Sequence, residues 1–333
     1  MKSVLVTATI GVVAVVSLGG CSGPSRSSSV GTSAIPPAAN RVPAYALPSG
    51  ADGRFAGEPR LSQRFFSPQV APDRQDGAPV EQEFFISDAG SDVFIFKNST
   101  YKKTGTTSKG LSDADGMWVD VKGNLYVANA TGPNVLEYKK GAGSPVCRYS
   151  ARLSNPVNVT TDKSGNVYVA DFGGSAVREY GQCSNKVKSQ ITINQPEGVA
   201  VDEKGNIFVA YFGPSGGNFE KFTNGKGKML DANVTSPGGI ILDKNGNLIA
   251  DDQGGSIDLI KPPYATAKIL VRGLSDPFHA SLNAKEDLLF NANAASSTVT
   301  IYTYPAMKLR KTITTNDGIN AAEGVAESPN AIF

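Results

Sequence analysis

The stretch Asp162-Lys163-Ser164-Gly165-Asn166-Val167-Tyr168-Val169-Ala170-Asp171 decides the fold, because near copies of it recur along the chain. The copies begin at Asp120, Asp202 and Asp243, and their glycines follow one another at steps of 42, 40 and 41 residues. A fixed period in this range is typical of a repeat architecture, in which each unit contributes one small supersecondary element.

Each repeat predicts short strands joined by tight turns. In the third copy, an apolar run at 199–201 precedes the turn 202–205, and a β-branched and aromatic run follows at 207–210. Asp bonds back to its own backbone in such a turn, and Gly adopts the positive φ that closes it. A third run and a weaker fourth run follow, as at 177–180 and 188–193. Four short antiparallel strands per ~40 residues predict a propeller blade, and no segment shows the apolar period of a helix.

The register of the repeat predicts six blades over residues 81–333. Residues 84–88 and 93–96 match the second and third strands of a blade, but no inner strand precedes them. The missing strand appears at the other end, where 323–326 repeats the pattern of 197–200. We therefore expect an all-β, six-bladed β-propeller with four antiparallel strands per blade. The C-terminal strand joins the first blade and removes an open edge.

The residues of the repeat also resemble a known family. Val167-Tyr168-Val169-Ala170-Asp171, after Asp-x-x-Gly-Asn and before a Gly-rich turn, looks like the NHL repeat. The whole region 81–333 is similar to six-bladed propellers of the NHL, TolB-like and gluconolactonase-like group. The resemblance implies the fold but no single activity, because that group contains both enzymes and binding scaffolds.

The N-terminus has the form of an export signal. Residues 1–20 contain a positive start, a short apolar run and small residues, as in a signal peptide. Leu18-Gly19-Gly20-Cys21 resembles the bacterial lipobox, which implies lipidation of Cys21 and an extracytoplasmic place in the bacterial cell envelope. Ser22 after the cysteine resembles outer-membrane sorting if the host is Gram-negative. The alternative is an ordinary cleaved signal peptide with an incidental cysteine.

Residues 21–80 are rich in Ser, Pro, Gly and Ala and predict a flexible, lipid-anchored tether, because such a composition buries too little apolar surface to fold. The charge is balanced, with 32 Lys and Arg against 30 Asp and Glu. No basic cluster interleaved with aromatic residues is evident, so we expect no nucleic-acid partner. We expect a monomer.

Two further cysteines, Cys147 and Cys183, fall at neighbouring places on one rim of adjacent blades by the repeat register. Export permits a disulfide between them, which we predict, with two unpaired thiols as the alternative.

Polar residues at the starts of the predicted inner strands form the candidate site. His279, the only histidine, takes the place that Gly198 and Gly239 occupy in other repeats. We expect a polar ligand-binding ring at one mouth of the central channel, made of Asp115, Asn158, Glu197, His279 and Glu323. We assign no catalytic residue and no metal ligand.

A second polar set recurs at the ends of the predicted second strands: Asp88, Asn129, Asp171, Asp252 and Asn291. Recurrence in successive blades predicts a structural cap of the next turn. The Asp-x-x-Gly-Asn turns carry oxygen groups but differ from a calcium loop, since their Gly is fourth rather than sixth and no Glu stands at position twelve. They are predicted to be hairpin turns.

Three hypotheses of function follow. The first is a membrane-anchored, non-catalytic propeller that binds a protein, small-molecule or carbohydrate ligand and needs no cofactor. The second is an exported lactonase of the gluconolactonase-like type. In that enzyme Ca²⁺ or another divalent ion would be held by Asp115, Asn158, Glu197 and Glu323. The third is a lyase assisted by His279.

Overall fold

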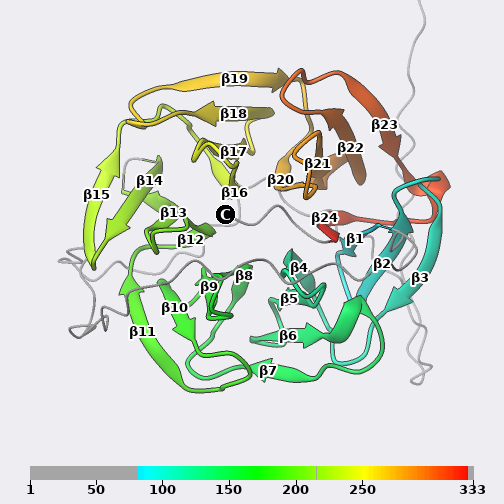
Figure 1. Ribbon diagram of the computed structural model, residues 1–333, viewed down its shortest axis with the longest axis horizontal. Helices are drawn as coiled ribbons and strands as arrows, with labels where there is room; N and C mark the ends of the chain where they lie inside the picture. The colour runs from blue at the N-terminus through cyan, green and yellow to red at the C-terminus, as the bar shows by residue number, and fades with distance from the viewer. Residues whose placement is uncertain (1–81, 215, 329–333) are drawn as a thin grey trace, which may run out of the picture. The chain divides into compact units, whose positions relative to one another are not determined.

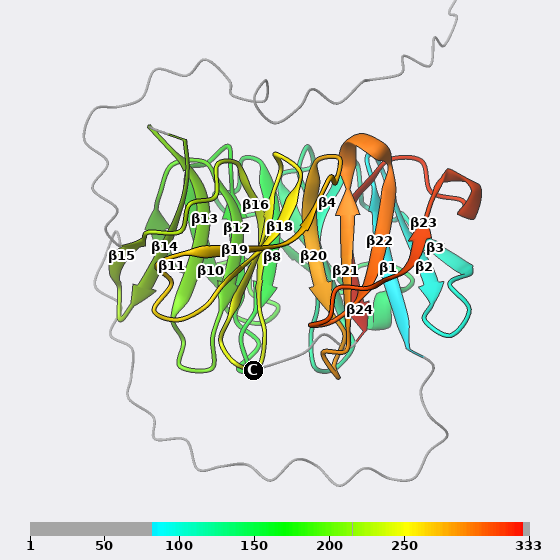
Figure 2. The same ribbon diagram turned by 90° about the horizontal axis from the view of Figure 1, so that it is seen from above.

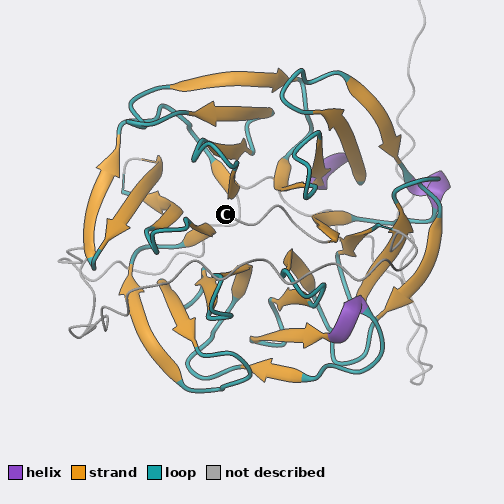
Figure 3. Cartoon of the chain, in the orientation of Figure 1, coloured by secondary structure: helices purple, strands orange, loops and turns teal. Residues whose placement is uncertain are grey.

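The computed structural model describes residues 82–214 and 216–328, and these form a ring of six four-stranded antiparallel sheets (Figure 1). Residues 1–81, which include the predicted signal peptide, Cys21 and the tether, lie outside the described part. Figure 3 shows that strands dominate, with only short helical turns between them. These are the 3-10 turns η2 (Lys139–Gly141), η3 (Ala294–Ser296) and η4 (Thr315–Asp317). None of the described helices has the length and apolar character needed to cross a membrane.

The chain runs from the axis outward in every blade after the first. From inside to outside, blade 1 consists of β24 (Ala322–Ser328), β1 (Glu83–Asp88), β2 (Asp92–Lys97) and β3 (Lys103–Thr107). Blade 2 consists of β4 (Ala114–Val119), β5 (Leu125–Asn129), β6 (Asn134–Tyr138) and β7 (Cys147–Tyr149). Blade 3 consists of β8 (Pro156–Thr161), β9 (Val167–Asp171), β10 (Ala176–Tyr180) and β11 (Val187–Thr192). Blade 4 consists of β12 (Pro196–Val201), β13 (Ile207–Gly213), β14 (Gly216–Thr223) and β15 (Lys226–Leu230). Blade 5 consists of β16 (Pro237–Leu242), β17 (Leu248–Asp252), β18 (Ser256–Ile260) and β19 (Ala267–Arg272). Blade 6 consists of β20 (Pro277–Leu282), β21 (Leu288–Asn293), β22 (Thr298–Thr303) and β23 (Leu309–Ile313).

The last described strand closes the ring, as the sequence predicts. β24 pairs antiparallel with β1, with Phe85 opposite Ala326 and Ile86 opposite Val325. Figure 1 shows the red C-terminal strand on the axial side of the cyan β1, and the two strands also lie side by side in the view of Figure 2. Because the two ends of the described chain share one sheet, blade 1 has the same four strands as the others.

The repeated turn is a hairpin corner. In blade 3, Asp162 Oδ1 accepts hydrogen bonds from the backbone N–H of Ser164 at 2.8 Å and of Asn166 at 2.9 Å, and its Oδ2 accepts from the Asn166 side chain at 2.7 Å. Gly165 closes the turn at φ +78°. The Asp at 120, 202 and 243 makes the same set of bonds. The carboxylate oxygens are therefore used within the turn, which confirms the structural prediction.

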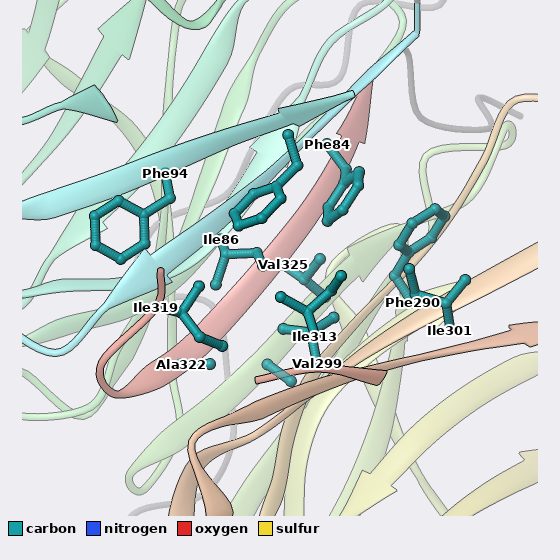
Figure 4. Close-up of a cluster of buried hydrophobic side chains, with 12 residues drawn as sticks. Phe84, Ile86, Phe94, Phe290, Val299, Ile301, Ile313, Ile319, Ala322 and Val325 are labelled. Atoms are coloured by element: carbon teal, nitrogen blue, oxygen red, sulfur yellow. The ribbon is translucent and has the colours of Figure 1, made fainter. Parts of the chain in front are cut away.

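Six apolar clusters fill the six interfaces between neighbouring blades. Successive side chains of a strand point to opposite faces of the sheet, so each blade contributes to two clusters. Val325, for example, packs toward blade 6, and Ala326 packs toward blade 2. Figure 4 shows the cluster between blades 6 and 1, where the rings of Phe84 and Phe290 lie 5.2 Å apart. The clusters make a rigid frame that fixes the inner strands.

The polar residues at the ends of the second strands cap the loop that enters the inner strand. Asn129 Oδ1 accepts from the backbone N–H of Ser112 at 2.8 Å and of Asp113 at 3.0 Å. Asp171, Asp252 and Asp88 accept from the equivalent N–H groups in their blades. The prediction of a structural cap is confirmed for these four residues.

Asn291 does not belong to this set, so its inclusion was wrong. The equivalent residue of blade 6 is Asn293, which stands opposite Pro277 as Asn129 stands opposite Ala114. The degenerate turn of blade 6 hides this register, because Asn283 replaces the usual Asp there. The Asn291 side-chain N–H instead donates to Asp251 Oδ1 of blade 5 at 2.8 Å.

The predicted disulfide between Cys147 and Cys183 is confirmed. It joins β7 of blade 2 to the β10–β11 connection of blade 3, with 5.2 Å between the Cα atoms.

Candidate functional site

The inner strands open with an irregularity in pairing that recurs in each blade. The register slips by an extra residue after Pro156, Pro196 and Pro277, and at corresponding points in the other three blades. Such a bulge redirects the residues beside it. Here it brings one residue of each inner strand against its neighbours around the axis.

Four of these six axial residues are glycines, and the other two are Asn158 and His279. The glycines are Gly116, Gly198, Gly239 and Gly324. A Cβ added to Gly116 would lie 2.8 Å from His279 Cε1, and one added to Gly239 would lie 2.5 Å from His279 Nδ1. Real Cβ atoms essentially never approach so closely. Blades 2 and 5 therefore have no side chain at this position, and the imidazole of blade 6 occupies the space.

His279 connects distant blades through hydrogen bonds. Its Nδ1 lies 2.9 Å from Asn158 Nδ2 in blade 3, across the ring, and its Nε2 lies 3.2 Å from Asp115 Oδ1 in blade 2. When the Asn158 amide N–H donates to Nδ1, Nε2 carries the ring hydrogen and donates to the carboxylate. Neutral, Nε2-protonated His279 satisfies both contacts, and this tautomer is assigned from the hydrogen-bond pattern.

All five residues predicted for the site are buried, with exposed fractions between 3 and 7 %. The structure joins Asp115, Asn158 and His279 directly. Glu197 and Glu323 occupy the position of Asp115 in blades 4 and 1, each directly before the axial glycine. They lie within the ring of inner strands rather than on an exposed rim.

The chemistry of the site is that of a hydrogen-bonded polar centre. Both ring nitrogens of His279 are engaged by Asp115 and Asn158. Within the described residues, no group of three or more His, Cys, Asp or Glu side chains is placed to hold a metal ion. The arrangement therefore provides carboxylate and amide groups for hydrogen bonding.

Two cavities lie away from the axis, and neither is predicted by the sequence. One, of about 410 Å³, lies on the outer side of blade 3 beside β11. The other, of about 240 Å³, lies between the turns of blades 5 and 6 and includes Lys244, Glu286 and Tyr304. Burial raises the pKa of Glu286, while the backbone N–H of Lys244 donates to its carboxylate and opposes that rise. The repeat register predicts which strand of a blade a residue belongs to, but it predicts no contacts between loops. Neither cavity can therefore be predicted from it.

No family model matches this chain, and no curated protein matches it. Solved structures do match. A chain in the crystal structure of a nidogen/laminin complex aligns with a TM-score of 0.63 and 16 % sequence identity, over 74 % of this chain and 98 % of that chain. At this identity the likeness shows the fold alone.

Proposed function

We propose that this chain is an extracytoplasmic binding module, an NHL- or TolB-like propeller held at the membrane by an acylated Cys21. The lipobox and the Ser- and Pro-rich tether, both outside the described residues, support the anchor. The disulfide between Cys147 and Cys183 fits an oxidising compartment outside the cytoplasm. The propeller forms a closed, rigid frame, on which loops and rims present a surface to a partner.

One observation carries the choice of binding over catalysis. His279, the only histidine, holds hydrogen bonds to Asn158 and Asp115 across the ring, and it is 3 % exposed. A general base must reach the proton that it takes from a substrate. An imidazole whose two nitrogens are both hydrogen-bonded to other blades acts first as a link in the scaffold.

The ligand proposed for the axial site is a small molecule with several N–H or O–H donors, such as a polyol or an amine. Asp115, Glu197 and Glu323 supply carboxylate oxygens on three blades, and these oxygens accept hydrogen bonds when ionised. Asn158 adds an amide that both donates and accepts. The proposed module acts as a monomer and without a cofactor.

The test uses the full-length lipoprotein in detergent micelles. Neutral sugars, sorbitol, spermidine and CaCl₂ are screened by thermal shift, and γ- and δ-lactones are offered in a pH-stat assay. We expect stabilisation by a polyol or amine that Glu197→Gln and Glu323→Gln weaken, and no lactone turnover. Calcium-dependent turnover that Glu197→Gln abolishes would replace this proposal with the lactonase.

The anchor has its own test, which compares the wild type with Cys21→Ala in cells fed an alkyne-labelled fatty acid. We expect label and membrane partitioning only with Cys21 present. A Cys21→Ala protein that stays with the membrane fraction would contradict lipidation.

A further inference from the structure

The outer strands of the propeller carry a one-sided charge. Strands β3, β7, β11, β15, β19 and β23 contain no Asp or Glu, although the whole chain has nearly equal numbers of basic and acidic residues. Their basic residues, which we call the basic belt, are Lys103, Arg148, Lys188, Lys226, Lys228, Lys268, Arg272, Arg310 and Lys311. All are exposed except Lys311, which is partly buried.

Lysines on edge strands have a simple structural use, because they oppose pairing with the edge of another sheet. This use accounts for isolated basic side chains in each blade. It does not account for a cavity with basic walls, and one blade has such a cavity.

The cavity of about 410 Å³ on blade 3, which we call the rim groove, runs beside the outer strand β11. Its lining residues are Ala151, Arg152, Asn185, Lys186, Val187, Lys188, Ser189 and Gln190. Three are basic, none is acidic and none is aromatic. Lys188 bonds to Glu179 at 2.8 Å. Arg152 and Lys186 are exposed, and no ion pair is found for either of them within residues 82–214 and 216–328.

The wall of the rim groove is fastened in place. Asn185 Oδ1 accepts from the backbone N–H of Ser150 at 2.6 Å and of Ala151 at 2.9 Å. The Tyr180 hydroxyl donates to the Ala151 carbonyl at 2.6 Å. The Cys147–Cys183 disulfide joins the same two blades close by in the chain. A groove with fixed backbone walls loses less conformational entropy when a ligand binds than a mobile loop does.

From the groove and the belt together, we propose that the rim groove binds an acidic sugar unit of a linear anionic polysaccharide. Arg152 and Lys186 contact its carboxylate, sulfate or phosphate groups. The Gln190 amide, whose nitrogen lies only at a long 3.4 Å from Thr192 Oγ1, meets its hydroxyls. The polymer continues along the basic belt, whose charges attract successive anionic units.

Two other polyanions fit the groove less well. A site for single-stranded nucleic acid combines basic residues that contact the phosphates with aromatic side chains on which the bases stack, and the groove lining has no aromatic residue. An acidic peptide would add as a strand to β11, but the pairing of β11 with β10 slips opposite Glu179 and Tyr180. Such a bulge twists an edge away from further pairing. A polysaccharide needs neither feature.

The test measures binding of alginate, a linear polyuronate, to the immobilised full-length lipoprotein by biolayer interferometry over a series of NaCl concentrations. Neutral dextran, poly-L-glutamate and a single-stranded oligonucleotide are the comparison probes. Variants Arg152→Gln and Lys186→Gln remove the groove charges. Lys268→Gln on β19 is the matched control, since it removes one exposed belt charge away from the groove. Thermal melting of every variant confirms folding.

We expect alginate to bind and dextran not to bind, with affinity falling as salt rises. Each groove variant should lose about tenfold in affinity, the effect of one charge-assisted contact, and Lys268→Gln less than about twofold. Equal losses in all three variants, no alginate binding, or tighter binding of poly-L-glutamate or the oligonucleotide would each overturn the proposal. The rim groove is remote from the axial residues, so the result of the alginate experiment does not depend on the result of the polyol and amine screen.

Discussion

Charged and polar side chains are buried at the axis of this propeller and exposed at its rim. At the axis, Asp115 and His279 are buried and hydrogen-bonded between blades. At the rim, side chains such as Arg152, Lys186 and Lys268 are exposed. A buried polar group without a partner costs free energy, whereas an exposed charge is solvated and costs little. The difference teaches that His279 and Asp115 link the blades at the axis, whereas the rim charges remain exposed to a partner.

The largest effect is expected for His279→Ala. The change removes both hydrogen bonds, leaves Asn158 and Asp115 without that partner, and opens a cavity where Gly116 and Gly239 make room for the ring. We expect a loss of about 4 kcal/mol in the free energy of unfolding, from the cavity and the lost hydrogen bonds together. Urea unfolding followed by tryptophan fluorescence measures it.

His279→Gln is the companion variant, because an amide can donate and accept where the imidazole does. It should recover part of the lost stability. If His279→Ala unfolds at the same urea concentration as the wild type, the axial network is not a structural link, and the comparison between axis and rim fails.

A smaller loss is expected when the disulfide is removed in the double variant Cys147→Ser, Cys183→Ser. The bridge closes a loop with a sequence separation of 36 residues, and restricting the unfolded chain in this way contributes roughly 3–4 kcal/mol in the chain-entropy model. The same bridge joins the two blades beside the rim groove, so alginate affinity should fall as well. Thermal melting and interferometry on one preparation check both effects; unchanged alginate binding would show that the groove walls do not need the bridge.

The sequence predicts the ring well, because its evidence is local and repeated. Asp162 and Gly165 recur with a turn geometry that fixes the position of each hairpin, and the echo at 323–326 identifies the closing strand. Asn291 shows where a repeat pattern ceases to predict the register. Where the turn of blade 6 departs from the pattern, the register was misjudged by two residues.

The site is less predictable, because its contacts are not local. The register places His279 beside the axis, but its reach to Asn158 depends on the glycines of other blades leaving space. The rim groove depends on how Asn185 holds the connection from blade 2. No repeat pattern carries that information.

The ring closure gives a test by pH, with an intermediate effect. Glu327 of β24 is fully buried, its carboxylate accepts from Asn98, and its backbone N–H donates to Ser281 Oγ of blade 6 at 3.1 Å. Burial raises the pKa of its carboxyl to about 8. The folded protein therefore holds a proton that the unfolded chain releases near its ordinary pKa of 4.5, and stability is lost as the pH rises from there through 8.

Glu327→Gln removes this titration. Between mildly acidic and mildly alkaline pH, we expect the free energy of unfolding to fall by about 2 kcal/mol less in the variant than in the wild type. This figure includes relaxation of the buried site. Burial also raises the pKa of Asp251, so a residual slope of the same sign should remain. Urea unfolding midpoints of the wild type and the variant at several pH values measure the difference. If the two pH profiles are parallel, the Glu327 carboxyl does not take up a proton on folding.

The smallest effect is expected at the rim, for the pair Lys226→Gln and Lys268→Gln. Both lysines are exposed on outer strands, and neither has an ion pair in the described part of the chain. Because water solvates them equally well before and after folding, each change should alter the free energy of unfolding by no more than about 0.5 kcal/mol. Their effect should appear instead as a weaker salt dependence of alginate binding, since fewer belt charges attract the polymer. A stability loss comparable to that of His279→Ala would mean that the rim charges, like the axial ones, belong to the scaffold.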